Sequence, residues 1–91
     1  KNKKKKQKNN FTTAQVLFTE ILNDNPQYAK GYFYLAIAQN GLGNLNQALS
    51  NFNTASQDES VRPNCYKYMA DIYTKQGNIQ QAQKFYQMSG M

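Results

Sequence analysis

The stretch GNLNQALSNF at residues 43–52 decides the fold, because it returns in altered form as GNIQQAQKFY at residues 77–86. Both copies read glycine, asparagine, an apolar residue, any residue, glutamine, alanine, three further residues and an aromatic ring. The offset from Gly43 to Gly77 also relates Tyr32 to Tyr66, and we call it the repeat step. It falls within the roughly 20–50 residues that are typical of stacked supersecondary units.

Apolar residues recur at steps of three and four from Phe11 onward, and no alternating run is long enough for a strand. This periodicity predicts an all-α fold of five helices joined by short connections. A polar loop is expected over residues 57–60, between two helical hairpins. Pro26 and Pro63 suit the opening turns of helices, because the missing N–H of proline needs no partner there.

The doubled stretch also predicts helix boundaries. Gly43 and Gly77 can end a helix in the left-handed conformation without steric cost. Asn44 and Asn78 follow them and are predicted N-caps, because an asparagine side chain can accept from the free N–H groups of the first turn. A glutamine at the third position after each asparagine completes a predicted capping box.

The basic character of the chain is confined to its first segment, KNKKKKQKNN at residues 1–10. It holds six of the eleven basic residues, and the other five balance the five acidic residues. Because this segment has no apolar side chain and its charges repel one another, we predict a disordered arm over residues 1–10 and a folded domain over residues 11–91. Such an arm is typical of a low-complexity spacer; a nuclear-import-like cluster or a contact with nucleic acid or an anionic membrane are the alternatives.

The inventory of reactive residues argues against an enzyme. The chain has no histidine, the commonest general base, and its one cysteine, Cys65, has no base to pair with. Asp58 and Glu59 are neighbours in a polar loop, where carboxylates are usually solvated. We therefore predict no active site, no metal site and no cofactor. The lone cysteine favours a reducing, cytoplasmic location, and no apolar stretch approaches the roughly 20 residues of a membrane span.

The repeat resembles that of the tetratricopeptide repeat family, whose signature is W-x-x-L-G-x-x-Y followed by Gly, Ala-x-x-x-Phe, Ala and Pro. One copy reads Tyr32, Leu35, Ala36, Gln39, Gly43, Ala48, Phe52 and Ala55. The next reads Tyr66, Met69, Ala70, Tyr73, Gly77, Ala82, Tyr86 and Ser89. Tyrosine replaces the family's tryptophan, alanine its small glycine and Gln39 its tyrosine, and Ser60 stands where a proline would close the middle copy.

The resemblance implies a right-handed superhelix of antiparallel helix hairpins with about two and a half repeats. The second half of one repeat covers residues 11–25, and full repeats cover residues 29–62 and 63–91. The helix over residues 11–25 has no preceding partner helix in register. We therefore interpret the chain as a piece of a longer array with apolar surface at its open ends.

The resemblance also implies a binding face, because in this family the first helix of each hairpin lines the concave side of the superhelix and contacts ligands. Transferred by register, that face contains Lys30, Phe33, Tyr34, Ile37, Asn40, Asn64, Lys67, Tyr68 and Asp71. Apolar side chains dominate it, which favours an apolar helix or an extended peptide as ligand. Some of these aromatic rings could instead pack only against the neighbouring hairpin.

These observations lead to one principal functional hypothesis and two alternatives. The principal hypothesis is a non-enzymatic module that scaffolds a larger protein complex by binding another protein on the concave face. The first alternative is an RNA-associated helical repeat that uses the lysine arm, although the neutral charge of residues 11–91 argues against a nucleic-acid surface. The second is a self-association segment that pairs through its open ends.

Overall fold

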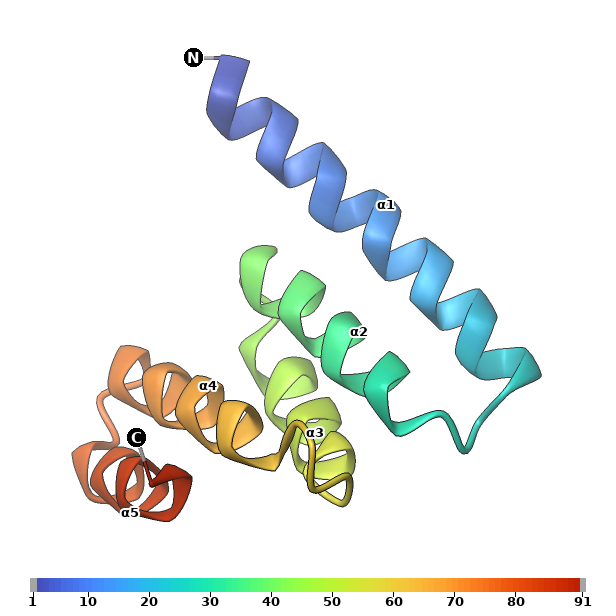
Figure 1. Cartoon of the computed structure of the whole chain (residues 1–91). Coiled ribbons are helices and arrows are strands. Elements are labelled where there is room, and N and C mark those ends of the chain that lie inside the picture. The colour runs from blue at the N-terminus through green and yellow to red at the C-terminus, as the bar shows by residue number, and fades with distance from the viewer. Residues whose placement is uncertain (1, 91) are drawn as a thin grey trace.

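The chain folds into a stack of α-helices in which each helix packs against the next in sequence. The computed structural model describes the backbone of residues 2–90 and the side chains of residues 9–90. Within these residues the helices are α1 (Asn2–Asp24), α2 (Ala29–Gly41), α3 (Leu45–Ala55), α4 (Arg62–Lys75) and α5 (Ile79–Ser89). Helices α2 and α3 form one hairpin and α4 and α5 a second, while α1 packs on α2 and α3 on α4 (Figure 1). The predicted all-α hairpin stack is thereby confirmed.

The turn inside each hairpin is built in the same way. Gly43 has a φ of +82° and Gly77 a φ of +79°, so both occupy the left-handed region where a Cβ atom would be strained. The next residue closes each turn with a backbone hydrogen bond, from Asn44 N to Gln39 O and from Asn78 N to Tyr73 O, each 2.8 Å long. The glycine boundaries predicted from the doubled stretch are confirmed.

The predicted caps are only half right. The side chain of Asn78 accepts a hydrogen bond from the backbone N–H of Gln81 at 3.3 Å, as expected for an N-cap. The side chain of Asn44 makes no such bond at the start of α3, so that part of the prediction is wrong. Both turns close through the backbone N–H of the asparagine, so the side-chain cap is an additional bond that is present at Asn78 and absent at Asn44.

The two prolines have different roles. Pro63 lies in the first turn of α4, as predicted. Pro26 does not open a helix, because α2 begins at Ala29. It lies instead in the α1–α2 turn, which a backbone bond from Tyr28 N to Asn25 O closes, and its carbonyl oxygen accepts the hydroxyl of Tyr32 at 2.9 Å.

The N-terminal segment differs from our prediction. We expected a disordered arm over residues 1–10, but α1 continues through residues 2–10 without a break. Lysine and glutamine have high helix propensity, and no glycine or proline separates this segment from the packed part of α1. Once the packed part of α1 has formed, further residues can be added to its end without a new helix nucleus. This advantage outweighs the lack of apolar residues in the segment. The domain boundary that we expected between residues 10 and 11 therefore lies inside the continuous helix α1.

Aromatic rings join one hairpin to the next. Phe52 of α3 is fully buried and stacks on Tyr68 of α4, with ring centroids 5.0 Å apart and an interplanar angle of 7°. Phe18 of α1 stacks on Tyr34 of α2 at 5.3 Å. One repeat step carries Phe18 onto Phe52 and Tyr34 onto Tyr68. The sequence repeat is therefore also a repeat of the contact between successive units.

Within the hairpins, small residues lie at the buried helix crossings. Ala36, Ala48 and Ala70 have no exposed surface and Ala82 has 2%. Without longer side chains, the helix backbones can approach closely, and the larger side chains of Phe33, Phe52 and Met69 fill the wider part of the core. The alanines at these repeat-related positions are thus buried in both hairpins.

Replacing Phe52 with alanine should be the most damaging single truncation in the core. The side chain touches the rings of Phe33 and Tyr68 and has no exposed surface, so its loss leaves a cavity between hairpins. We expect a loss of about 3–5 kcal/mol in the free energy of unfolding, measured by urea denaturation. Met88→Ala, at a side chain that is 46% exposed, is the control and should change it by less than about 0.5 kcal/mol. Equal effects of the two substitutions would contradict this core.

Candidate functional site: the α2–α4 groove

An open groove lies between the first helices of the two hairpins. It has a volume of about 350 Å³ and is lined by Phe33 and Ile37 of α2 and by Asn64, Lys67, Tyr68 and Asp71 of α4. We call it the α2–α4 groove. All six residues belong to the face that the resemblance to the tetratricopeptide repeat implies, so the structure brings together two thirds of that expected set.

Helical spacing explains the groove's two walls. Phe33 and Ile37 are one helical turn apart on α2, and the α4 residues follow steps of three and four from Asn64 to Asp71, so each group shares one helix face. The rings of Phe33 and Tyr68 meet edge to face at 5.9 Å and form the apolar floor. Phe33 is buried, whereas Asn64 and Lys67 are exposed. The groove therefore has an apolar base and a polar α4 rim.

The acidic end of the groove is supported from α5. The hydroxyl of Tyr86 donates a short hydrogen bond to the carboxylate of Asp71. This bond raises the pKa of Tyr86, because the hydroxyl would lose the bond on giving up its proton beside a carboxylate. Sequence reasoning placed Tyr86 only in the repeat pattern and missed this role. The signal that could have found it is the hairpin itself, which brings the end of α5 back beside α4.

Three predicted residues do not line the groove. Tyr34 turns toward α1 and stacks on Phe18. This matches the alternative in which a ring packs against the neighbouring unit, although its side chain is still 42% exposed. Asn40 lies beyond the groove, where its side-chain oxygen accepts a hydrogen bond from Lys75 Nζ at 3.4 Å.

Lys30 is the third, and it lies toward the α3–α4 loop. Hydrogen bonds from the hydroxyl and the backbone N–H of Ser60 hold the pKa of Asp58 below its ordinary value, and the charge of Lys30 adds to this shift. Lys30 is exposed and near enough to Asp58 to influence it. Its charge therefore acts at the edge of the loop and not inside the groove.

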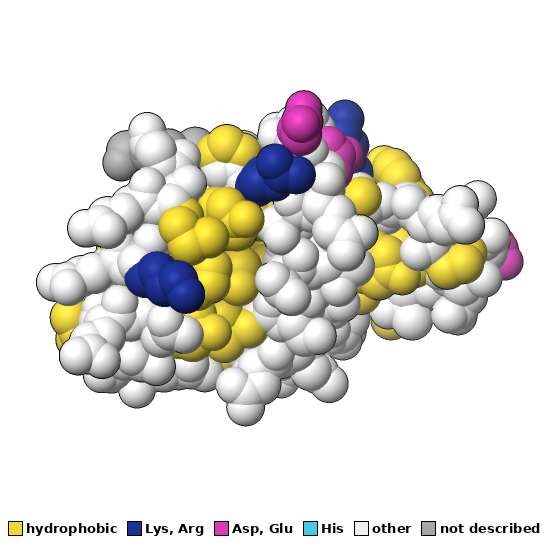
Figure 2. Space-filling view, turned by 90° about the horizontal axis from the view of Figure 1, so that it is seen from below, with side chains coloured by type: hydrophobic (Ala, Val, Ile, Leu, Met, Phe, Trp, Pro, Cys, Tyr) yellow, Lys and Arg dark blue, Asp and Glu magenta, His cyan; other side chains and the backbone are white. Residues whose placement is uncertain are grey.

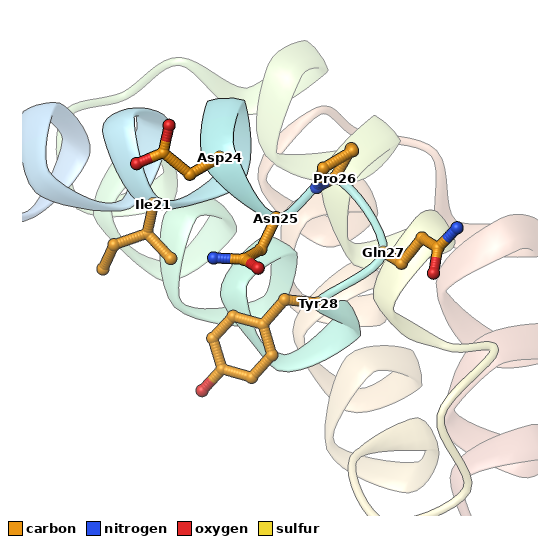
Figure 3. A pocket seen from close by; sticks show the side chains of 6 residues that line it. All are labelled: Ile21, Asp24, Asn25, Pro26, Gln27 and Tyr28. Atoms are coloured by element: carbon orange, nitrogen blue, oxygen red, sulfur yellow. The ribbon is translucent and has the colours of Figure 1, made fainter.

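A second open pocket, which the sequence did not predict, lies at the α1–α2 turn (Figure 3). It has a volume of about 610 Å³ and is lined by Ile21, Asp24, Asn25, Pro26, Gln27 and Tyr28. Figure 3 shows the side chains of Ile21 and Tyr28 pointing to the same side of the turn, while Asp24 points away from them. The signal that could have found it is a pair of large apolar side chains beside a polar turn.

Among the side chains of residues 9–90, no group of three or more His, Cys, Asp or Glu residues is placed to hold a metal ion. Cys65 is a free cysteine and is fully buried in the core. No helix in the described part of the chain is both long enough and apolar enough to cross a membrane.

Burial should make the Cys65 thiol unreactive in the folded protein. Burial raises its pKa from 9.0 to about 11, because the core disfavours the thiolate. An aromatic disulfide reagent at pH 8 should therefore label the native protein far more slowly than the urea-unfolded chain. Equal labelling rates in the two states would contradict the burial.

The same shift predicts a pH dependence of stability. The unfolded thiol titrates near 9, so the contribution of the neutral buried thiol is complete below that pH and is lost as the pH rises through about 11. Between pH 9 and pH 11 the free energy of unfolding should fall more for the wild type than for Cys65→Ala, which separates this effect from tyrosine and lysine titration. Parallel curves would overturn the assignment.

Comparison with known proteins adds no assignment to this geometry. No protein-family model matches the sequence, and a search of curated proteins found no match to it. The functional interpretation therefore depends on the residues and contacts described above.

Proposed function

We propose that this chain is a non-enzymatic protein-interaction module that binds a peptide or an apolar helix in the α2–α4 groove. The observation that carries the proposal is that six residues chosen by repeat register line one open groove. Its volume of about 350 Å³ is near the lower end of the roughly 300–1,000 Å³ typical of small-molecule pockets, which suits one large side chain of a peptide ligand. A scaffold role within a larger complex is part of the same proposal.

The side chains of the groove indicate the kind of ligand. Phe33, Ile37 and Tyr68 offer an apolar floor for one large side chain of the ligand. The carboxamide of Asn64 can both donate to and accept from a peptide backbone. Lys67 offers a positive charge at the exposed rim, which favours an acidic residue beside the apolar anchor.

The surface also supports protein binding. On the face drawn in Figure 2, hydrophobic side chains gather in a patch with lysine or arginine side chains beside it. Apolar surface bordered by polar and charged groups is typical of sites where other proteins dock. Membership of the tetratricopeptide repeat family is part of the proposal, and the constant repeat step of the turns and ring stacks supports it.

A peptide-display selection against the whole chain tests this function. Substitutions of Phe33 or Tyr68 would disturb the core, so the variant carries Asn64→Arg and Lys67→Glu, at two exposed positions on the rim of the groove. We expect selected peptides to share a large apolar residue and to bind this variant about 10- to 1,000-fold more weakly, which corresponds to about 1–4 kcal/mol.

The matched control carries Gln83→Arg and Lys84→Glu, which make similar changes of size and the same changes of charge at exposed positions on α5. Peptide affinity for this control should equal that of the wild type, and circular dichroism should show unchanged helicity in both variants. Peptides that bind the groove variant and the control equally well would place the binding site elsewhere.

A further inference from the structure

The carboxylate of Asp71 is held in place at one end of the α2–α4 groove. Asp71 lines the groove from α4, and its Oδ1 atom accepts a hydrogen bond from the hydroxyl of Tyr86 on α5. This bond joins the two helices of the second hairpin. A side chain that is already held loses less conformational freedom when a ligand binds to it. The bond from Tyr86 therefore preorganises the acidic group of the groove.

The bond from Tyr86 leaves the carboxylate able to bind a cation. A neutral hydroxyl donor does not cancel the negative charge of Asp71. An ionised carboxylate accepts hydrogen bonds at both of its oxygens, so Oδ2 and a second lone pair of Oδ1 remain for a ligand. Asp71 therefore offers the groove a charged acceptor that suits the side chain of arginine or lysine.

The two neighbouring lysines of α4 compete only weakly for this carboxylate. Lys75 lies one helical turn after Asp71, but its Nζ atom donates to the side chain of Asn40 at 3.4 Å. Lys67 lies one turn before Asp71 and is exposed. Exposed pairs in which lysine precedes the acidic residue by four positions contribute little. A basic group of a ligand therefore meets little competition from α4 itself.

The first hairpin shows that the fold does not need a charge at this position. One repeat step before Asp71 and Tyr86 stand Ile37 and Phe52. Phe52 is fully buried, and Ile37 is partly buried and packs against the same core cluster. The second hairpin replaces this apolar pair with a hydrogen-bonded polar pair. Packing accounts for the apolar pair, whereas a carboxylate that lines a groove has a use in ligand recognition.

We propose that Asp71 is a specificity-determining residue of the α2–α4 groove and binds a basic side chain of the peptide ligand. Tyr86 is the positioning residue that holds its carboxylate. Arginine suits the site best, because its planar guanidinium can bond to both carboxylate oxygens. Lys67 repels such a side chain from the rest of the rim, which directs it to the end of the groove at Asp71. This inference rests on the proposed function, because it names a feature of the ligand that the groove binds.

A double-mutant cycle measured by fluorescence anisotropy tests this pairing on the whole chain. The probes are a synthetic peptide with the tightest-binding sequence from the display selection and versions in which each basic residue in turn is replaced by glutamine. Asp71→Asn should weaken binding of the first peptide about tenfold or more, and binding of one glutamine version by less than about twofold. Asparagine keeps an oxygen that can accept from Tyr86, so this variant removes the charge and retains the contact with α5.

Glu59→Gln is the matched control, because it removes one negative charge from the exposed α3–α4 loop. It should change the affinities of all the peptides equally or not at all. Circular dichroism should show the helicity of the wild type in both variants. Equal weakening of every peptide by Asp71→Asn, or the same discrimination by the control, would overturn the role of Asp71.

Tyr86→Phe tests the positioning role. The substitution keeps the ring and the charge of Asp71 but removes the hydrogen bond that holds the carboxylate. The preference for the basic peptide over its glutamine version should fall severalfold, while the affinity for the glutamine version stays unchanged. Tyr28→Phe removes a tyrosine hydroxyl at the α1–α2 turn and should leave the preference unchanged. A merely structural role of Tyr86 would weaken both peptides equally, and this result would overturn its assignment.

The outcomes separate this inference from the proposed function. Peptides that bind the Asn64→Arg and Lys67→Glu variant more weakly, but carry no basic residue, would overturn the role of Asp71 and leave the function of the groove intact. Peptides that bind this variant as well as they bind the wild type would overturn both proposals.

Discussion

Stacking between Phe52 and Tyr68 is the contact on which the rest of the structure depends. It joins the last helix of one hairpin to the first helix of the next, in the middle of the core cluster. Phe33 contacts both rings, so the same group of side chains links α2, α3 and α4. Neither hairpin can bury these apolar faces alone, and stacking is what removes them from water. The Phe18–Tyr34 pair repeats the contact one unit earlier.

Around this repeated contact, pairs of side chains at equivalent positions differ in chemistry between the two hairpins. Gln39 and Asn51 are joined by a hydrogen bond in the first hairpin, and Tyr73 and Phe85 stack at the same positions in the second. Either pair suits the position, because the two amides satisfy each other and the two stacked rings bury apolar surface.

A second pair of equivalent positions differs in the volume of its side chains. A Cβ atom on Gly31 would lie 2.8 Å from Leu22 Cδ2, so a larger residue there would force the leucine side chain of α1 to shift. One repeat step later, Ser56 replaces Leu22 and Cys65 replaces Gly31, and both are buried. One large side chain opposite a glycine is thus replaced by two small side chains, one at each position.

Local sequence rules predicted the elements that depend on a single residue or on one helix face. The positive φ of Gly43 and Gly77 and the place of Pro63 follow from spacing or backbone freedom, whereas the six residues of the α2–α4 groove were expected from the resemblance to a repeat family. The rules failed where a tertiary or cooperative effect competes with a local one. Tyr34 packs on α1 because Phe18 is available, Asn44 is not needed as a cap, and helix extension overrides the polarity of residues 2–10.

Ring stacks related by one repeat step hold successive units together, and this role is tested most directly by nuclear Overhauser spectroscopy on protein with selectively labelled phenylalanine and tyrosine rings. Cross-peaks are expected between Phe18 and Tyr34 and between Phe52 and Tyr68, whose centroids are 5.3 and 5.0 Å apart. A folded helical protein that lacks both cross-peaks, with its rings in contact only inside single hairpins, would contradict this role of the rings.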